Sequence, residues 1–174
     1  IWRKTVKGFD FIGGHSAWNA PKGLEDWFMA NDGALDPRRP FFYIQHPHPK
    51  DTCNCAWAWG RDDGTVTKLL SNYPNAVAFS GHSHSPLDDD RDLWQGSFTS
   101  IGTSSLKYLY PMPARENTYQ DDWSAKPPSQ MQKMDPSDGR QGMVMRVYDS
   151  AITFEKREFV YDEPIGEACY LPWP

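Results

Sequence analysis

Four of the five histidines in this chain stand in two closely spaced pairs, each just after a short apolar run. The pairs are His46 with His48, after residues 41–45, and His82 with His84, after residues 76–80. Neutral imidazole is a common metal ligand. Because side chains two residues apart in extended backbone point to the same side, His82 and His84 are expected to face one point, with Gly81 letting the backbone turn tightly. The pattern indicates metal chemistry.

The two apolar runs are predicted to be adjacent parallel strands of one sheet. Residues 41–45 contain almost no polar side chain, which is typical of a strand covered on both faces. Residues 65–71 are expected to form a short helix between the runs, so the order strand, helix, strand predicts a crossover unit. In such units the functional groups lie at the carboxyl ends of the strands, which is where both histidine pairs stand.

The remaining segments predict a mixed α/β chain with a C-terminal β-hairpin. Leu24, Trp27 and Phe28 share one face of a helix expected over residues 24–30. The other expected elements are a strand at 9–13, a loop at 50–63, one or two strands within 93–109, a long irregular loop at 110–140, a hairpin of 142–148 and 151–160, and a tail at 164–174. We interpret residues 1–174 as a single, partial domain.

Composition argues against some classes of function. The net charge is −5 and no cluster of Lys and Arg is visible, so a surface for nucleic acid is not expected. No apolar run approaches the ~20 residues that span a bilayer, so no membrane segment is expected either. Cys53 and Cys55 are too close for an easy mutual disulfide. They are expected to be free thiols in a loop, with an accessory metal role as the alternative.

With these residues in view, the chain resembles the C-terminal half of the calcineurin-like metallophosphoesterases. The likeness rests on Gly-His-Ser-His at 81–84 after a buried strand and on an upstream strand followed by His46 and Pro47, and it covers about residues 5–106. Residues 9–13 and 98–101 resemble the flanking strands of that family. The resemblance implies a four-layer α/β/β/α sandwich and an enzyme that hydrolyses phosphate mono- or diesters with two divalent metal ions of the Mn, Fe or Zn class.

The resemblance also implies roles for the histidines. His46 and His82 would bind one metal ion, and His84 would bind the other. His46 and His82 are therefore expected within metal-sharing distance, ~3–4 Å between ligand atoms. His48 has no family role, and a substrate-binding or a supporting position is open to it. His15 has only its place after a strand end in its favour. No catalytic residue is assigned.

The departure from the family is as informative as the match. The family's Asp-x-His, Gly-Asp-x-x-Asp and Gly-Asn-His-Asp/Glu motifs are not found in this sequence. Without their carboxylates, three histidines are expected to hold at most one ion, weakly. We therefore expect a C-terminal portion of a larger protein that is inactive alone, whose partners are a missing N-terminal half and a phosphate ester, with homodimer formation through exposed apolar surface.

Two other interpretations stay open. One is an enzyme completed by a separate N-terminal chain or by exchange between protomers. The other is a non-enzymatic binding module whose exposed aromatic residues recognise a sugar or a peptide. An upstream reading frame that encodes the three missing motifs in order would favour the first interpretation, that of a catalytic half. A native start codon near Ile1 would favour the binding module.

Overall fold

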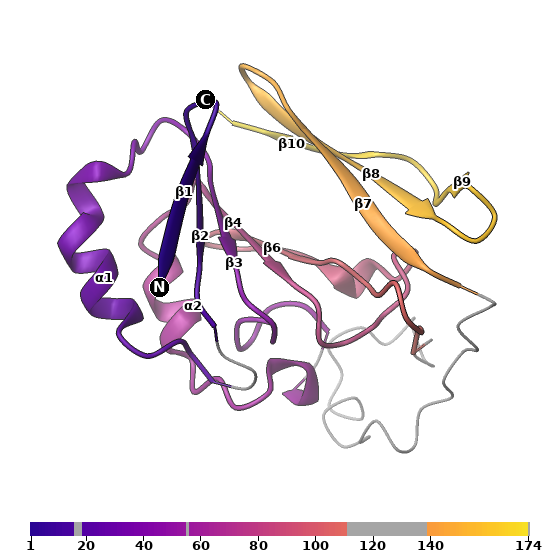
Figure 1. The fold of residues 1–174 in the computed structure, drawn as a ribbon, viewed down its shortest axis with the longest axis horizontal. Helices are drawn as coiled ribbons and strands as arrows, with labels where there is room; N and C mark the ends of the chain where they lie inside the picture. The colour runs from indigo at the N-terminus through magenta and orange to yellow at the C-terminus, as the bar shows by residue number, and fades with distance from the viewer. Residues whose placement is uncertain (16–18, 55, 111–138, 174) are drawn as a thin grey trace.

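The computed structural model describes residues 1–15, 19–54, 56–110 and 139–173, which form two β-sheets and a set of short helices. The first sheet has six strands in the order β1-β2-β3-β4-β6-β5. The second has the order β10-β8-β7, with β9 paired to β8. Figure 1 shows the second sheet lying across the first at one side of the molecule.

The first sheet combines a parallel centre with antiparallel edges. Its strands are β1 (Trp2–Val6), β2 (Phe9–Gly13), β3 (Phe41–Ile44), β4 (Ala76–Ser80), β5 (Leu93–Gln95) and β6 (Thr99–Gly102). Strands β2, β3, β4 and β6 run parallel, and β1 and β5 pair antiparallel at the two edges. The predicted adjacency of the two apolar runs is therefore confirmed.

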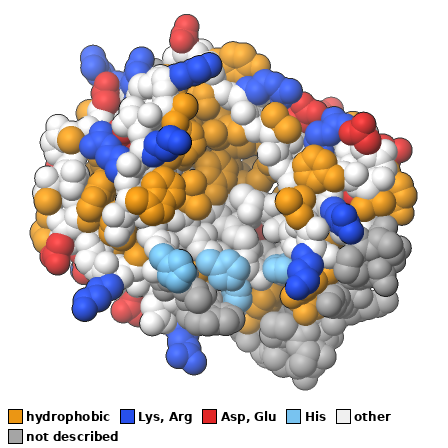
Figure 2. Space-filling view, viewed as in Figure 1, with side chains coloured by type: hydrophobic (Ala, Val, Ile, Leu, Met, Phe, Trp, Pro, Cys, Tyr) orange, Lys and Arg blue, Asp and Glu red, His pale blue; other side chains and the backbone are white. Residues whose placement is uncertain are grey.

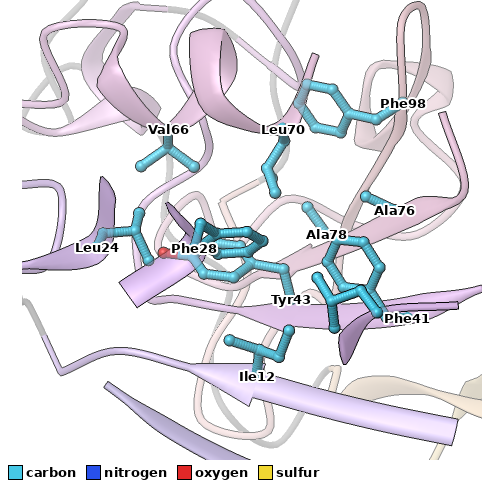
Figure 3. Packing of buried hydrophobic residues seen from close by; sticks show 11 residues of the cluster. Ile12, Leu24, Phe28, Phe41, Tyr43, Val66, Leu70, Ala76, Ala78 and Phe98 are labelled. Carbon is cyan, nitrogen blue, oxygen red and sulfur yellow. The ribbon is translucent and has the colours of Figure 1, made fainter. Parts of the chain in front are cut away.

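Helices cover one face of this sheet. They are α1 (Leu24–Asn31) and α2 (Thr65–Leu70), with the 3-10 turns η1 (Asp32–Ala34), η2 (Ala56–Trp59) and η3 (Asp90–Asp92) elsewhere. The α-helices turn buried Leu24, Phe28, Val66 and Leu70 onto the sheet, as expected for the helical face at 24–30 (Figure 3). Because side chains alternate along β3, Phe41 and Tyr43 meet the helices while Phe42 faces the other way.

The second sheet covers the opposite face. It consists of β7 (Gln141–Val147), β8 (Ala151–Glu158), β9 (Glu163–Pro164) and β10 (Cys169–Pro172). Ile152 and Phe154 of β8 pack with Phe42, Val77 and Ile101 of the first sheet. The described residues thus form a mixed α/β fold. The two α-helices cover one face of the first sheet, and the second sheet covers the other face.

Several boundaries differ from the sequence expectations. The predicted hairpin is confirmed as β7 and β8, but the expected tail at 164–174 is wrong, because β10 pairs antiparallel with β8 and returns Leu171 to the core. Strand β1 was not predicted. Most of the expected loop at 110–140 lies outside the described residues. Among the described residues, no helix is long and apolar enough to cross a membrane.

Candidate metal centre

Parallel pairing of β3 and β4 brings His46 and His82 together. Ile44 stands opposite Phe79 in the register, so the two histidines leave the sheet at the same edge. The Gly81 amide donates to the His46 carbonyl over 3.1 Å, which continues the pairing beyond the strands. His82 Nδ1 lies 3.2 Å from His46 Nε2. Figure 2 shows histidine side chains in one row beside a hollow lined with hydrophobic side chains.

This nitrogen–nitrogen distance fits the donor set of one metal ion. Two imidazole nitrogens at ~2.0–2.1 Å from a tetrahedral ion stand ~3.3 Å apart. A hydrogen bond between a protonated and an unprotonated ring nitrogen has a similar length. The two rings, 5.0 Å apart at an interplanar angle of 70°, need little movement to pass from one arrangement to the other.

The surroundings keep His82 in the form that binds metal. Burial lowers the pKa of His82 to about 4, helped by the neighbouring rings of His46 and His84, while a hydrogen bond with the Trp57 backbone acts in the opposite direction. The imidazole is therefore neutral at pH 7 and keeps a lone pair for a cation. Trp57 also packs on this ring, with ring centroids 5.7 Å apart.

His84 is held by a different part of the chain. Its Nδ1 lies 3.0 Å from the Tyr108 carbonyl oxygen, so Nδ1 donates this hydrogen bond and, in a neutral ring, Nε2 carries the lone pair. The Tyr108 ring packs against the His84 ring in a tilted arrangement, with centroids 4.4 Å apart. A backbone carbonyl that fixes the tautomer is the usual support of a metal-binding histidine. The sequence carried no signal for Tyr108, which lies 24 residues beyond His84.

The turn that presents these rings is not the one expected. Gly81 does not adopt a left-handed conformation, and it is His82 and His84 that have positive φ angles of 35° and 54°. The segment is therefore a left-handed turn, and the prediction of extended backbone at His82 and His84 is wrong. The chain does turn tightly directly after Gly81, but the positive φ angles fall on the two histidines. Histidine enters this region more readily than most residues. Such strain persists where surrounding contacts hold it, often at functional sites.

His48 lies buried beneath the turn. It is fully buried, with Nε2 3.0 Å from Ser83 Oγ, and Ser83 donates to the Gly81 carbonyl over 3.1 Å. Burial lowers the pKa of His48 to about 3, and the neighbouring His82 adds to this. Of the two roles left open for His48, its position favours support of the turn.

His15, the fifth histidine, is exposed directly after β2 and stays outside this group.

Within the described residues, no three His, Cys, Asp or Glu side chains converge so as to hold one metal ion. The resemblance assigns His84 to a second ion, so convergence on a single ion is not required. Cys53 and Cys169 are free, and Cys55 lies outside the described residues. Comparison with family models, with curated proteins and with solved structures finds no match to this chain.

Proposed function

We propose that this chain supplies the histidine side of a dinuclear-metal phosphoesterase centre. The single observation that carries the proposal is the contact between His82 Nδ1 and His46 Nε2, 3.2 Å apart at the carboxyl ends of two parallel strands. Together with the Gly-His-Ser-His motif, this is the geometry that the resemblance implies. The substrate would be a phosphate mono- or diester.

The chain's own residues have separable tasks in this proposal. His46 and His82 hold one divalent ion, and His84 holds the other through Nε2. Tyr108 orients the His84 ring, and His48 supports the turn through Ser83. When bound, divalent ions of this class polarise phosphoryl oxygens and lower the pKa of a water molecule. The family's motifs that carry the bridging carboxylates are not found in this sequence, so in this proposal those carboxylates come from outside these 174 residues.

A binding module remains the alternative, and the exposed aromatic side chains allow it to be weighed. Tyr148 lies before β8 and Phe159 directly after it, and both are exposed. An eight-residue strand spans ~26 Å, so these rings stand at opposite ends of the sheet. One sugar would not contact both of these rings. Phe159 and Tyr161 are exposed only two residues apart, however, so a binding surface of neighbouring rings stays open.

Hydrolysis assays test the proposal. With p-nitrophenyl phosphate or bis-p-nitrophenyl phosphate and added Mn²⁺ or Zn²⁺, we expect only trace turnover by the 174-residue chain, because no bridging carboxylate and no leaving-group acid is supplied. Adding a polypeptide that carries the family's three aspartate motifs, in cis or in trans, is expected to restore turnover. His82→Ala is then expected to remove most of it, with His15→Ala as the matched control.

Two results would contradict the proposal. Robust turnover by the 174 residues alone, abolished by chelator and restored by metal, would mean that the chain is a complete enzyme. Restored turnover that is indifferent to His82→Ala would place the chemistry elsewhere.

A further inference from the structure

A cavity of about 160 Å³ opens between the two sheets, outside the proposed metal centre. On the first sheet it is lined by Ala76 and Val77, which begin β4, and by Thr99, which begins β6. On the second sheet it is lined by residues of β8 and β10. Because His82 follows the other end of β4, the cavity and the metal centre lie at opposite ends of the strands.

The inner wall of the cavity is mostly apolar. Val77 and Ile152 are buried there, and Leu171 of β10 is partly buried beside them. Sites for small molecules are commonly lined in this way, with a small number of polar groups that fix the orientation of the ligand. An apolar cavity of about 150 Å³ holds one benzene molecule. The space therefore suits an apolar body of one six-membered ring.

Proline residues and an asparagine fix the rim of the cavity. The prolines precede β3, precede β4 or belong to β10, and they are Pro37, Pro40, Pro74 and Pro172. Each proline ring holds its backbone φ near one value. The Asn75 side-chain amide donates to the carbonyls of Asp36 and Arg39 over 3.2 and 2.6 Å, which ties the loops before β3 and β4 together. A rim that is already fixed reduces the entropy lost on binding.

The charged side chains that line the cavity are two exposed arginines. Arg38 is held by Asp36, with Nε and Nη2 at 3.1 and 3.2 Å from the two carboxylate oxygens. Arg39 lies over the Phe9 ring, 5.4 Å from its centroid, and donates from Nη1 to the Gly8 carbonyl over 3.3 Å. The Asp36 carboxylate feels the charge of Arg39, but its oxygens are bonded to Arg38. Since a guanidinium has five N–H donors, Arg39 keeps donors for an anion.

We propose that this cavity binds a small aromatic carboxylate. The ring would lie among Val77, Ile152 and Leu171, and the carboxylate would bind the Arg39 guanidinium, whose planar fork matches that group. Such a ligand would contact both β10 and the loop before β3, so it would stabilise the packing of the two sheets. The proposal does not depend on the proposed metal centre, because it uses no histidine.

Titration calorimetry with phenylacetate tests the site. For a ligand of this size we expect one saturable site with a dissociation constant of about 1 mM. Benzylamine carries the same ring with a positive charge and is expected not to bind. Arg39→Gln is expected to weaken phenylacetate binding about tenfold, because it removes a charged hydrogen-bond donor. Arg61→Gln, at an exposed arginine outside the cavity, is expected to bind like the wild type.

A second pair of variants tests where the ring lies. Leu171→Phe enlarges a side chain that lines the cavity and is expected to weaken phenylacetate binding severalfold by filling the space. Tyr170→Phe changes the neighbouring residue, which is exposed and does not line the cavity, and is expected to bind like the wild type. Urea unfolding of each variant checks that it folds, and either Arg39→Gln or Leu171→Phe suffices for the test.

Three results would overturn the proposal. The first is no saturable binding of phenylacetate by the wild type at about 10 mM, tenfold above the expected dissociation constant. The second is equal binding of phenylacetate and benzylamine, which would mean that the cavity takes an apolar ring without regard to charge. The third is binding that is undiminished in a folded Arg39→Gln or Leu171→Phe variant, which would place the ligand elsewhere on the chain.

Discussion

His48 makes the stability of the fold depend on pH in a way that one substitution can isolate. The side chain is fully buried and its pKa is lowered to about 3, so the folded chain keeps it neutral through the mildly acidic range. In the unfolded chain an ordinary histidine takes up a proton below about pH 6.5. Since the unfolded state then binds more protons, stability falls as pH drops from about 6.5 towards 3.

The size of the effect follows from these two pKa values. Each pH unit between them costs about 1.36 kcal/mol, so lowering the pH from 8 to 5 removes about 2 kcal/mol through His48 alone. This figure is insensitive to the folded pKa, provided that it stays below about 4, because the folded residue is then still neutral at pH 5. Other titrating groups contribute to the total change but are common to the wild type and a His48 variant.

Urea unfolding of the wild type and of His48→Gln at both pH values measures the contribution. Gln retains a donor for Ser83, but the substitution is expected to lower the free energy of unfolding at pH 8. Between pH 8 and pH 5 the variant should lose about 2 kcal/mol less of this free energy than the wild type loses. His15→Gln, at an exposed position, serves as the control and is expected to follow the wild type. Equal losses in the wild type and in His48→Gln would show that His48 is not a buried neutral imidazole.

Two substitutions in the core test the packing that positions the site. Phe42→Ala removes a fully buried ring that contacts Phe11 and Phe79 between the two sheets. It is expected to lower the free energy of unfolding, measured by urea titration, by about 3–5 kcal/mol. A loss below about 1 kcal/mol would contradict the placement of the second sheet. Gly102→Ala places a Cβ against the Asp92 carboxylate, and it is expected to cost about 1–3 kcal/mol in the same assay, whereas Gly33→Ala, in open space, is expected to be tolerated.

The strands that precede the histidines were predictable because their sequences are typical of buried strands. Residues 41–44 and 76–79 are continuous apolar runs. Such runs are typical of strands that are covered on both faces of a sheet. Their parallel pairing followed from the helix between them. The proximity of His46 and His82 followed in turn from the pairing, because both residues leave the same sheet edge.

The elements that sequence reasoning missed depend on distant partners. Strand β1 is exposed along its whole length, so it has no apolar alternation to reveal it, and it is held by pairing to β2 and by the Arg3–Asp10 ion pair. Strand β10 is short and lies in a proline-containing terminal stretch. The left-handed turn at His82 and His84 is stabilised by contacts such as the Tyr108 carbonyl, which no local pattern encodes.

Calorimetric titration of the 174-residue chain with Zn²⁺ at pH 7.5 tests the central claim most directly. The contact between His82 Nδ1 and His46 Nε2 predicts one weak, saturable site, because two imidazoles supply only half of a tetrahedral donor set. Binding should be lost in both His46→Ala and His82→Ala and retained in His15→Ala. Binding that persists unchanged in the first two variants, or no saturable binding by the wild type at millimolar Zn²⁺, would contradict a metal centre at these strand ends.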